Sequence, residues 1–338
     1  MEVIKPILFY FPTTVLFVDD DPVFLANIGF EIDDKTPLMS CDKSRHVTDL
    51  LSQRSSFHTL VKKMVSHVDF EDVDAPFGRA VRANIDCLYN EVFNPNRFEY
   101  ISTLVVDYSM PGLNGAELCG LLKDNPVKKI MLTGAADYNI AVDLFNSGLI
   151  DSFIIKDSPL MTDQLNLSIH TAQRSYFKEA ALPLIHAIPN EGSPLRISVF
   201  WEFINNYIAQ NSFSEYYLID GSGSFLFIDF FGNPVWMIVK SDREINGYFN
   251  IAVDSEASDD LVYSLDKRLK LPFFLTENDQ KIPVSKWADY FHAAKNFPGL
   301  DGYYFAILEN YSHASFDGSV IFSHKDFMDK KCEIDSSA

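Results

Sequence analysis

Asp107 lies in a stretch whose residue types suit chemistry at the end of a strand. Residues 104–115 read LVVDYSMPGLNG, so apolar residues lead into the aspartate and a Met-Pro-Gly turn with a second glycine follows. This pattern is typical of a buried strand that ends abruptly in a loop. A carboxylate at that point is accessible to a reactant. Many α/β proteins share the pattern, so the partners of Asp107 must decide its role.

A second acidic group follows another predicted strand, TVLFV at residues 14–18. This strand stops at Asp19, Asp20 and Asp21, and Pro22 comes next. A helix start explains one of these aspartates, because Asp favours the N-cap and Pro the first turn. Three adjacent carboxylates at a strand end need a cation or strong hydration. Oxygen ligands in this number favour a hard divalent ion.

Two more predicted strands end in polar residues. The strand at 129–132 ends in Thr133, and the strand at 152–155 ends in Lys156, with helices predicted at 116–122 and 137–147. Short apolar strands that alternate with helices predict a doubly wound, parallel five-stranded α/β domain. Functional groups in such sheets gather at the carboxyl ends of the strands.

These strand ends would place a carboxylate nucleophile, a Mg²⁺ site, a hydroxyl and an ammonium around one point. That set suits phosphoryl transfer to a carboxylate, because cations neutralise the phosphoryl oxygens. Each residue alone also has a plain structural interpretation: Thr133 as a turn residue and Lys156 as a solvated lysine.

The sequence here resembles the receiver domain of two-component response regulators. The stretches that carry the resemblance are LFVDDDP, LVVDYSMPGLNG, LTGAAD and FIIKDSP. The resemblance implies that Asp107 accepts a phosphoryl group from the phosphohistidine of a sensor histidine kinase or phosphotransfer protein. It also implies a flavodoxin-like fold.

The resemblance further assigns the surrounding residues. Mg²⁺ would be bound by Asp20, Asp107 and the main-chain carbonyl of Ser109, with Asp19 nearby through water. The phosphoryl oxygens would contact the remaining two polar residues, Thr133 and Lys156. Phe153 matches the switch aromatic, whose movement with Thr133 would report phosphorylation.

Two features depart from the family pattern. Asp157 follows the lysine where many members have proline, which affects local geometry only. In addition, 87 positions separate Asp20 from Asp107, about twice what short connections need. Amphipathic helices predicted at 57–68 and 77–92 account for the excess as a helical insertion near 42–95, which packs on the flank or builds a dimer surface. The acidic run at 69–74 is interpreted as a solvated loop.

Linker composition at 189–194 (PNEGSP) predicts a boundary between two domains. The receiver would span 1–188 and include a long final helix from 160, and an α+β output domain with an antiparallel sheet would span 195–330, before a tail at 331–338. In the output domain we predict helices at 195–210, 259–269 and 284–295, strands at 303–308 and 319–323, and an antiparallel meander between Gly-rich turns.

Composition limits the function classes. The formal charge is −19 and both halves are acidic, which argues against DNA as a partner because phosphate neutralisation needs a basic face. The four cysteines form no CxxC pair, so neither a zinc ribbon nor a disulfide framework is predicted. The apolar N-terminal stretch is interrupted by Lys5, Pro6 and Pro12, and we expect a soluble cytoplasmic protein with no membrane segment.

The activity of the output domain is not readable from the sequence, which contains no helix-turn-helix, phosphate loop or metal-binding His/Cys spacing. His292, His313 and His324 are isolated. The leading hypothesis is a regulator, a homodimer whose assembly responds to phosphorylation, with an output domain that binds protein or a small ligand. Its layout also resembles that of quorum-sensing response regulators. The alternatives are a receiver-gated enzyme or nucleotide-binding output and, less favoured, a divergent DNA-binding regulator.

Overall fold

The computed structural model describes residues 7–54, 56–69, 79–83, 85–187, 193–276, 279–309, 311 and 316–336. The chain divides into two compact units. The first, here called the parallel unit, comprises Tyr10–Arg82, Asn94–Ile185 and Asp326–Ala338. The second, the antiparallel unit, comprises Met1–Phe9, Ala83–Phe93 and His186–Lys325. The predicted fold class is confirmed for both.

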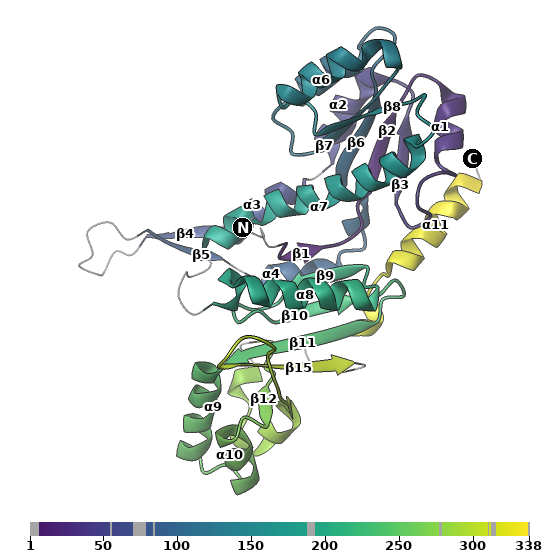
Figure 1. The fold of residues 1–338 in the computed structure, drawn as a ribbon. Helices are drawn as coiled ribbons and strands as arrows, with labels where there is room; N and C mark the ends of the chain where they lie inside the picture. Colours follow the sequence, from purple (N-terminus) through teal and green to yellow (C-terminus); the bar gives the residue numbers. More distant parts are fainter. Residues whose placement is uncertain are drawn as a thin grey trace. The chain divides into compact units, whose positions relative to one another are not determined.

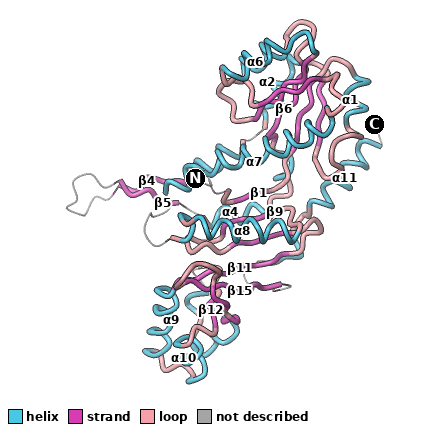
Figure 2. The backbone as a smooth tube through the Cα atoms, viewed as in Figure 1, coloured by secondary structure: helices cyan, strands magenta, loops and turns pink. Residues whose placement is uncertain are grey.

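A five-stranded parallel sheet forms the centre of the parallel unit (Figures 1 and 2). In spatial order its strands are β3 (Leu38–Cys41), β2 (Thr14–Val18), β6 (Ile101–Asp107), β7 (Lys128–Thr133) and β8 (Ser152–Ile155). Its central strands are buried along their whole length, which explains why they read as continuous apolar runs. The chain order reverses between β2 and β6, and in such sheets ligands bind at that point.

Helices cover both faces of this sheet. Helices α1 (Pro22–Ile28) and α7 (Met161–Ala187) pack on one face through residues such as Ile28 and Leu165. The opposite face is covered by three helices: α2 (Ser44–Gln53), α5 (Gly115–Leu121) and α6 (Tyr138–Asn146). The prediction of a long final helix is confirmed, since α7 has 27 residues.

The insertion between β3 and β6 differs in part from the prediction. α2 packs on the sheet through Val47 and Leu51 and belongs to the doubly wound core. The first predicted helix, at 57–68, is present as α3 (Phe57–Met64), but its end is wrong because Val65–Asp69 forms strand β4. The second is wrong over Arg79–Ala83, which forms strand β5 paired with β4. Short apolar runs fit helix and strand periods alike, and here strand pairing prevails.

The insertion continues with α4 (Asp86–Tyr89) and two 3₁₀ turns, Asn90–Phe93 and Arg97–Glu99. Residues 70–74 of the predicted acidic loop lie outside the described residues, as do residues 189–192 of the predicted linker. Phe57 anchors α3, because its ring lies 5.1 Å from that of Phe11 and 5.8 Å from that of Phe177.

The antiparallel unit is built on a six-stranded sheet in the order β1-β9-β10-β11-β15-β14. These strands span Phe9–Tyr10, Glu215–Leu218, Phe225–Ile228, Pro234–Ser241, Tyr303–Glu309 and Lys295–Asn296. Helix α8 (Ser198–Asn211) buries Phe200, Trp201 and Ile204. The Trp201 ring meets that of Phe225 in β10, and aromatic packing therefore holds the helix to the sheet.

The rest of this unit follows β11. Helix α9 (Asp242–Asp254) starts in a capping box in which the Ser241 side chain accepts from the Glu244 N–H, and α10 (Asp259–Asp266) packs against it. A two-stranded sheet joins β12 (Lys270–Pro272) to β13 (Phe291–Ala293). No helix among the described residues is both long and apolar enough to cross a bilayer.

Two smaller predictions in this half are wrong. The predicted helix at 284–295 is a 3₁₀ helix at Val284–Tyr290 that runs into β13, where pairing with β12 takes over. The predicted strand at 319–323 begins as a 3₁₀ turn, Gly318–Val320, because the Asp317 side chain accepts from the Ser319 N–H. Much of the predicted tail is part of α11 (His324–Ser336).

Candidate functional site

The carboxyl ends of four neighbouring strands place the predicted polar residues in one row. Val18 of β2 pairs with Val106 of β6, so Asp19 and Asp107 follow side by side. Thr133 ends β7, and its carbonyl accepts from the N–H of Lys156, which follows β8, at 2.9 Å. Parallel pairing in register thus brings together residues that are up to 137 positions apart.

The run of three aspartates divides into two roles. Asp21 is the N-cap of α1, where its side chain accepts from the Val23 N–H at 2.8 Å. The Asp21 N–H donates to Oδ1 of Asp19 at 2.9 Å and fixes that buried carboxylate. Asp20 is exposed. The helix-start interpretation therefore holds for Asp21 and leaves Asp19 and Asp20 for the site.

The donor set of this site fits a small divalent cation. One carboxylate oxygen from each of Asp19, Asp20 and Asp107 lies within 4.8 Å of the others. Carboxylate oxygens are the ligands that Mg²⁺ prefers, and the open side at Asp20 leaves room for the waters that Mg²⁺ retains. The predicted contribution of the Ser109 carbonyl stays a prediction; the Ser109 N–H donates to Oδ2 of Asp107 at 3.1 Å.

Lys156 links the two buried carboxylates. Its Nζ lies 2.6 Å from Oδ2 of Asp19 and 2.9 Å from Oδ1 of Asp107. The ammonium also sits 4.5 Å from the centre of the Phe24 ring on α1, a cation–π distance. Burial favours the neutral amine, but the hydrogen bonds to Asp19 and Asp107 prevail and raise the pKa of Lys156. The side chain stays a cation.

Burial raises the pKa of Asp107, and the hydrogen bond from Lys156 opposes that rise. The negative charge on Asp19 also raises the pKa of Asp107. Desolvated carboxylates of this kind gain from a further positive charge, because it would compensate for lost hydration.

The loop after Asp107 is held close to the strand by Gly115, the first residue of α5. A Cβ on Gly115 would lie 2.3 Å from the carbonyl oxygen of Asp107. The Gly115 N–H donates to the carbonyl of Tyr108 at 3.0 Å. Only glycine allows this approach, so the second glycine of the LVVDYSMPGLNG stretch sets the position of Asp107.

Thr133 and Phe153 share one face of the sheet. The register pairs Met131 with Phe153, both of which pack in the cluster under α2 and α5. Thr133 lies two residues beyond Met131 and points the same way. The Phe153 ring is half-buried and meets the ring of Tyr138 on α6 edge-on at 5.6 Å. Their switch roles stay predictions.

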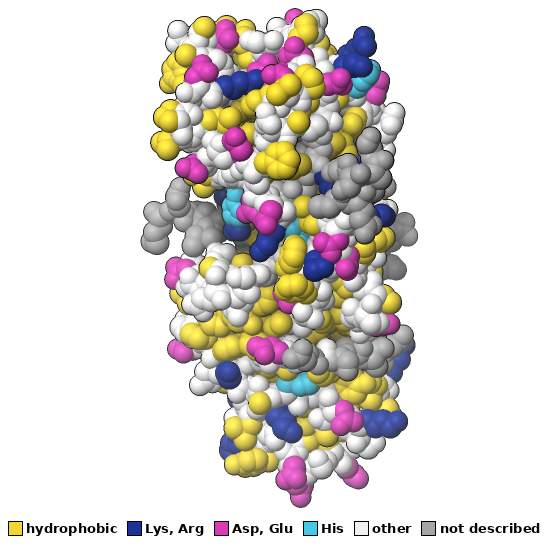
Figure 3. All heavy atoms as spheres, turned by 90° about the vertical axis from the view of Figure 1, so that its right-hand side faces the viewer, with side chains coloured by type: hydrophobic (Ala, Val, Ile, Leu, Met, Phe, Trp, Pro, Cys, Tyr) yellow, Lys and Arg dark blue, Asp and Glu magenta, His cyan; other side chains and the backbone are white. Residues whose placement is uncertain are grey.

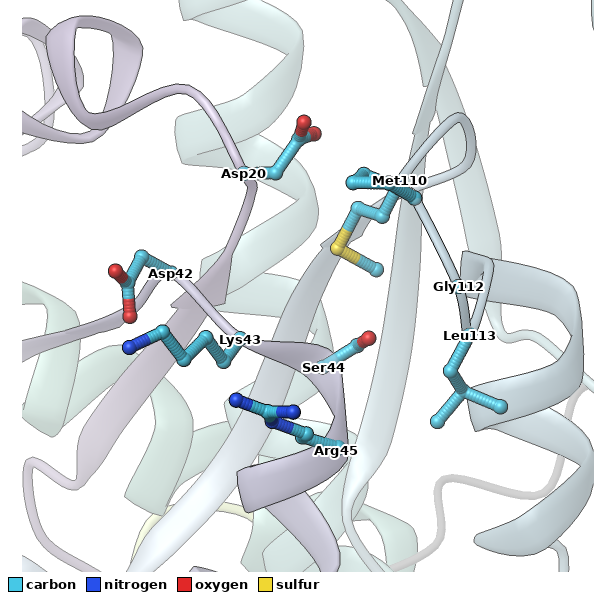
Figure 4. A pocket seen from close by; sticks show the side chains of 9 residues that line it. Asp20, Asp42, Lys43, Ser44, Arg45, Met110, Gly112 and Leu113 are labelled. Carbon is cyan, nitrogen blue, oxygen red and sulfur yellow. The ribbon is translucent and has the colours of Figure 1, made fainter.

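Several residues at this edge were missed by sequence reasoning. Two of them are Phe24 and Asp137, whose carboxylate accepts from the Ser109 hydroxyl at 3.5 Å. Neither residue lies directly after a predicted strand, and that position was the feature by which the other site residues were predicted. Beside Asp20 a cavity of about 230 Å³ is also lined by residues 42–45 and 110–113 (Figure 4).

Solved structures resemble the chain, although no family model and no curated protein sequence matches it. The structure of the Legionella pneumophila response regulator LqsR has 27% sequence identity and a TM-score of 0.76, with 97% of each chain covered. A receiver domain protein from Clostridium thermocellum has 17% identity and a TM-score of 0.32, with 48% of this chain and 95% of that chain covered. A CheY-like receiver domain from Methanospirillum hungatei has 18% identity and a TM-score of 0.31, with 50% and 98% covered.

The expected resemblance to response regulators is confirmed, because the similarity to LqsR extends over both units. The parallel unit therefore has the response-regulator receiver fold.

Proposed function

We propose that this protein is a response regulator that accepts a phosphoryl group on Asp107 in a Mg²⁺-dependent reaction. The observation that carries the proposal is the position of Lys156, whose ammonium lies between the carboxylates of Asp19 and Asp107. An ammonium in this position can neutralise the charge of phosphoryl oxygens that arrive at Asp107.

The transfer follows from these contacts. A carboxylate oxygen of Asp107 attacks the phosphorus of a phosphohistidine, an O–P bond forms, and the N–P bond breaks and leaves its electron pair on the imidazole. The product is an acyl phosphate on Asp107. Lys156 and the hydroxyl of Thr133 would contact the phosphoryl oxygens, and the ion pair with Asp19 would keep Lys156 in position.

Mg²⁺ bound by Asp20, Asp107 and the Ser109 carbonyl, with Asp19 nearby through water, would neutralise charge on the phosphoryl oxygens. Asp20, which is exposed and belongs to no ion pair among the described residues, is available to bind it.

The direct test is labelling with a small acyl phosphate. The full chain with Mg²⁺ should gain the mass of one phosphoryl group, and Asp107→Asn and Asp107→Ala should gain none. Equal labelling in wild type and both variants would refute the assignment. Labelling that does not depend on Mg²⁺ would refute the metal site alone.

The proposed partner is a sensor histidine kinase or a phosphotransfer protein. The acyl phosphate carries about two negative charges where the carboxylate carried one, so transfer from such a donor would change the charge at the sheet edge by about −1. We propose that Thr133 and Phe153 then shift and bias the surface around α6, and that the change in that surface alters homodimer assembly. Solution mass measured before and after phosphorylation tests this. A constant mass would favour signalling within one chain.

The LqsR structure is that of a response regulator, and by that similarity we extend the regulatory role to the antiparallel unit. The layout of the sequence, which resembles that of quorum-sensing response regulators, leads to the same class. DNA binding is disfavoured: Figure 3 shows the basic side chains of one face as scattered spots among acidic ones, with no extended basic patch among the residues it describes there. The net charge of −19 supports this.

A small-ligand output is the second candidate, favoured by a cavity of about 280 Å³ in the antiparallel unit. Tyr248, Phe274 and Trp287 line it together with the exposed Ile251. An enzymatic function is less well supported. Burial favours the neutral form of nearby Lys240, but Asp220 and Glu244 prevail and raise the pKa of Lys240. Lys240 therefore stays protonated and cannot act as a base.

Saturation-transfer NMR of small aromatic molecules against wild type and Ile251→Glu tests the ligand candidate. A cavity ligand should lose its signal in the variant, whose new charge lies at the opening. Signals that persist unchanged would refute binding there. The substitution is at a half-exposed position, so the fold should be kept.

A further inference from the structure

Phe24 on α1 lies against the ammonium of Lys156. The Nζ atom of Lys156 is 4.5 Å from the centre of the Phe24 ring and over its face, where the ring attracts a cation. Phe24 is half-buried and packs against the apolar cluster between α1, α7 and the sheet. Only 27% of the Lys156 side chain is exposed. The attraction therefore acts on a cation that has lost part of its hydration, which strengthens it.

The start of α1 ties the position of Phe24 to the acidic site. Asp21 caps this helix by accepting from the Val23 N–H, and its own N–H donates to Oδ1 of Asp19 at 2.9 Å. The other oxygen of Asp19, Oδ2, lies 2.6 Å from the Nζ atom of Lys156. One buried carboxylate thus holds both the start of the helix and the ammonium. Because these contacts form a closed loop, the ring of Phe24 and the ammonium keep a fixed relation.

Phosphoryl transfer changes one neighbour of the ammonium and leaves Phe24 as it is. Lysine reaches the site on a flexible four-carbon stem, and a charge stabilises a reaction best when it is already in position. Asp107 loses its carboxylate charge when it becomes an acyl phosphate, so its ion pair with Lys156 cannot persist unchanged. The apolar ring of Phe24 is not altered by the transfer. It is therefore suited to hold the ammonium before and after the reaction.

We propose that Phe24 is a positioning residue for the transfer to Asp107, and that the face of its ring holds the Lys156 ammonium where the phosphoryl oxygens arrive. This inference rests on the proposed function. Phe24 acts through Lys156 and takes no part in bond making. The role depends on the negative charge of the ring face, since an aliphatic side chain of similar volume would pack against α7 and the sheet without attracting the cation.

The test changes the charge on the ring face and keeps the ring. Trifluorinated phenylalanine in place of Phe24 in the full chain has nearly the same shape and a much less negative face, and Phe24→Leu removes the ring. With a small acyl phosphate and saturating Mg²⁺, the rate of labelling at Asp107 should fall by roughly two- to fivefold in both variants. Monofluorinated phenylalanine should give an intermediate rate, a gradation that loss of packing would not produce. A small donor needs no docking surface on α1, so partner binding does not enter the result.

Phe30 supplies the matched control, because it follows α1 and is 90% exposed. Trifluorinated phenylalanine in place of Phe30 should leave the labelling rate unchanged.

A second measurement needs no phosphoryl donor. In the proton NMR spectrum of the unphosphorylated protein, the Cε protons of Lys156 should resonate upfield of those of exposed lysines, because they lie next to an ammonium over a ring face. This displacement should disappear in Phe24→Leu. A labelled wild type with equal rates across the fluorinated series, an equal loss in the Phe30 control, or Cε protons at the ordinary frequency would each overturn the inference and leave the proposed function standing. A wild type that takes no label would refute the proposed function, and this inference with it.

Discussion

The ammonium of Lys156 lies 2.6 Å from a carboxylate oxygen of Asp19, a residue that is only 2% exposed. The second carboxylate that it meets, Asp107, is 7% exposed. Two acids and one base leave the cluster with an excess negative charge, and this imbalance is the physical basis of several expected results.

Lys156→Gln should leave both carboxylates without their cation. Loss of one partner from a partly buried cluster should lower the free energy of unfolding by about 1–3 kcal/mol, and the rate of labelling at Asp107 should fall by about 10²-fold. Urea unfolding and acyl-phosphate labelling measure the two effects. Lys123→Gln, at an exposed position of the same unit, is the control; an unchanged labelling rate in Lys156→Gln would contradict the role of the ammonium.

Asp20→Asn should separate metal affinity from stability. Asp20 is exposed, so unfolding should change by less than about 0.5 kcal/mol, whereas the Mg²⁺ concentration needed for labelling should rise by about tenfold or more. Asp21→Asn is the matched control, because asparagine caps a helix about as well as aspartate. If both variants need the same Mg²⁺ concentration, Asp20 is not a ligand.

Gly115→Ala should disturb Asp107 through the backbone. The added Cβ would meet the Asp107 carbonyl oxygen at 2.3 Å, so we expect a loss of about 2 kcal/mol or more in unfolding free energy and slower labelling. Gly120 lies on the same helix with nothing within 4 Å of an added Cβ. Gly120→Ala should therefore stabilise the protein by roughly 0.5–1 kcal/mol. Equal stability of the two variants would show that the loop can move away from α5.

Cys41 and Cys119 should differ in reactivity. Burial raises the pKa of Cys119 to about 12, so at pH 8 roughly one thiol in 10⁴ is the thiolate. Cys41 is half-buried and should be alkylated first. In a Cys87→Ser and Cys332→Ser background, iodoacetamide should modify one site until denaturant is added. Rapid modification of Cys119 without denaturant would show that α5 opens from the sheet.

His58 should make stability depend on pH. Burial lowers the pKa of His58, whose Nε2 donates to the Tyr176 carbonyl at 3.0 Å. The folded pKa lies below the unfolded value of about 6.5, so the stabilisation is present above pH 6.5 and is lost as pH falls through the folded pKa. Urea unfolding at several pH values should show a weaker acid dependence in His58→Gln. His46→Gln, at an exposed position of α2, should retain the wild-type dependence.

The parallel unit was predictable because its signals are local. Each strand is a short apolar run that ends in a polar residue, and parallel order follows from the alternation with helices. Asp19, Asp107, Thr133 and Lys156 were therefore placed at one edge before any contact was known. Phe24 was not predicted at this edge, because its contact with Lys156 depends on how α1 packs on the sheet.

Pairing between distant segments explains what was missed. Arg79–Ala83 fits a helical spacing, yet it pairs with Val65–Asp69 as a strand, and no residue in it signals that choice. Phe9–Tyr10 similarly joins a sheet whose next strand begins at Glu215. Pairing between segments about 200 positions apart cannot be recognised from the spacing of apolar residues within either segment.

The path of the chain between the two units has a consequence for any attempt to study them apart. It passes from one unit to the other after residues 9, 82, 93, 185 and 325. A fragment that begins after residue 188 would lack β1 and leave β9 as an open, apolar sheet edge, which invites aggregation. Because neither unit is one continuous segment, a single crossover between two related genes would separate parts of the same sheet.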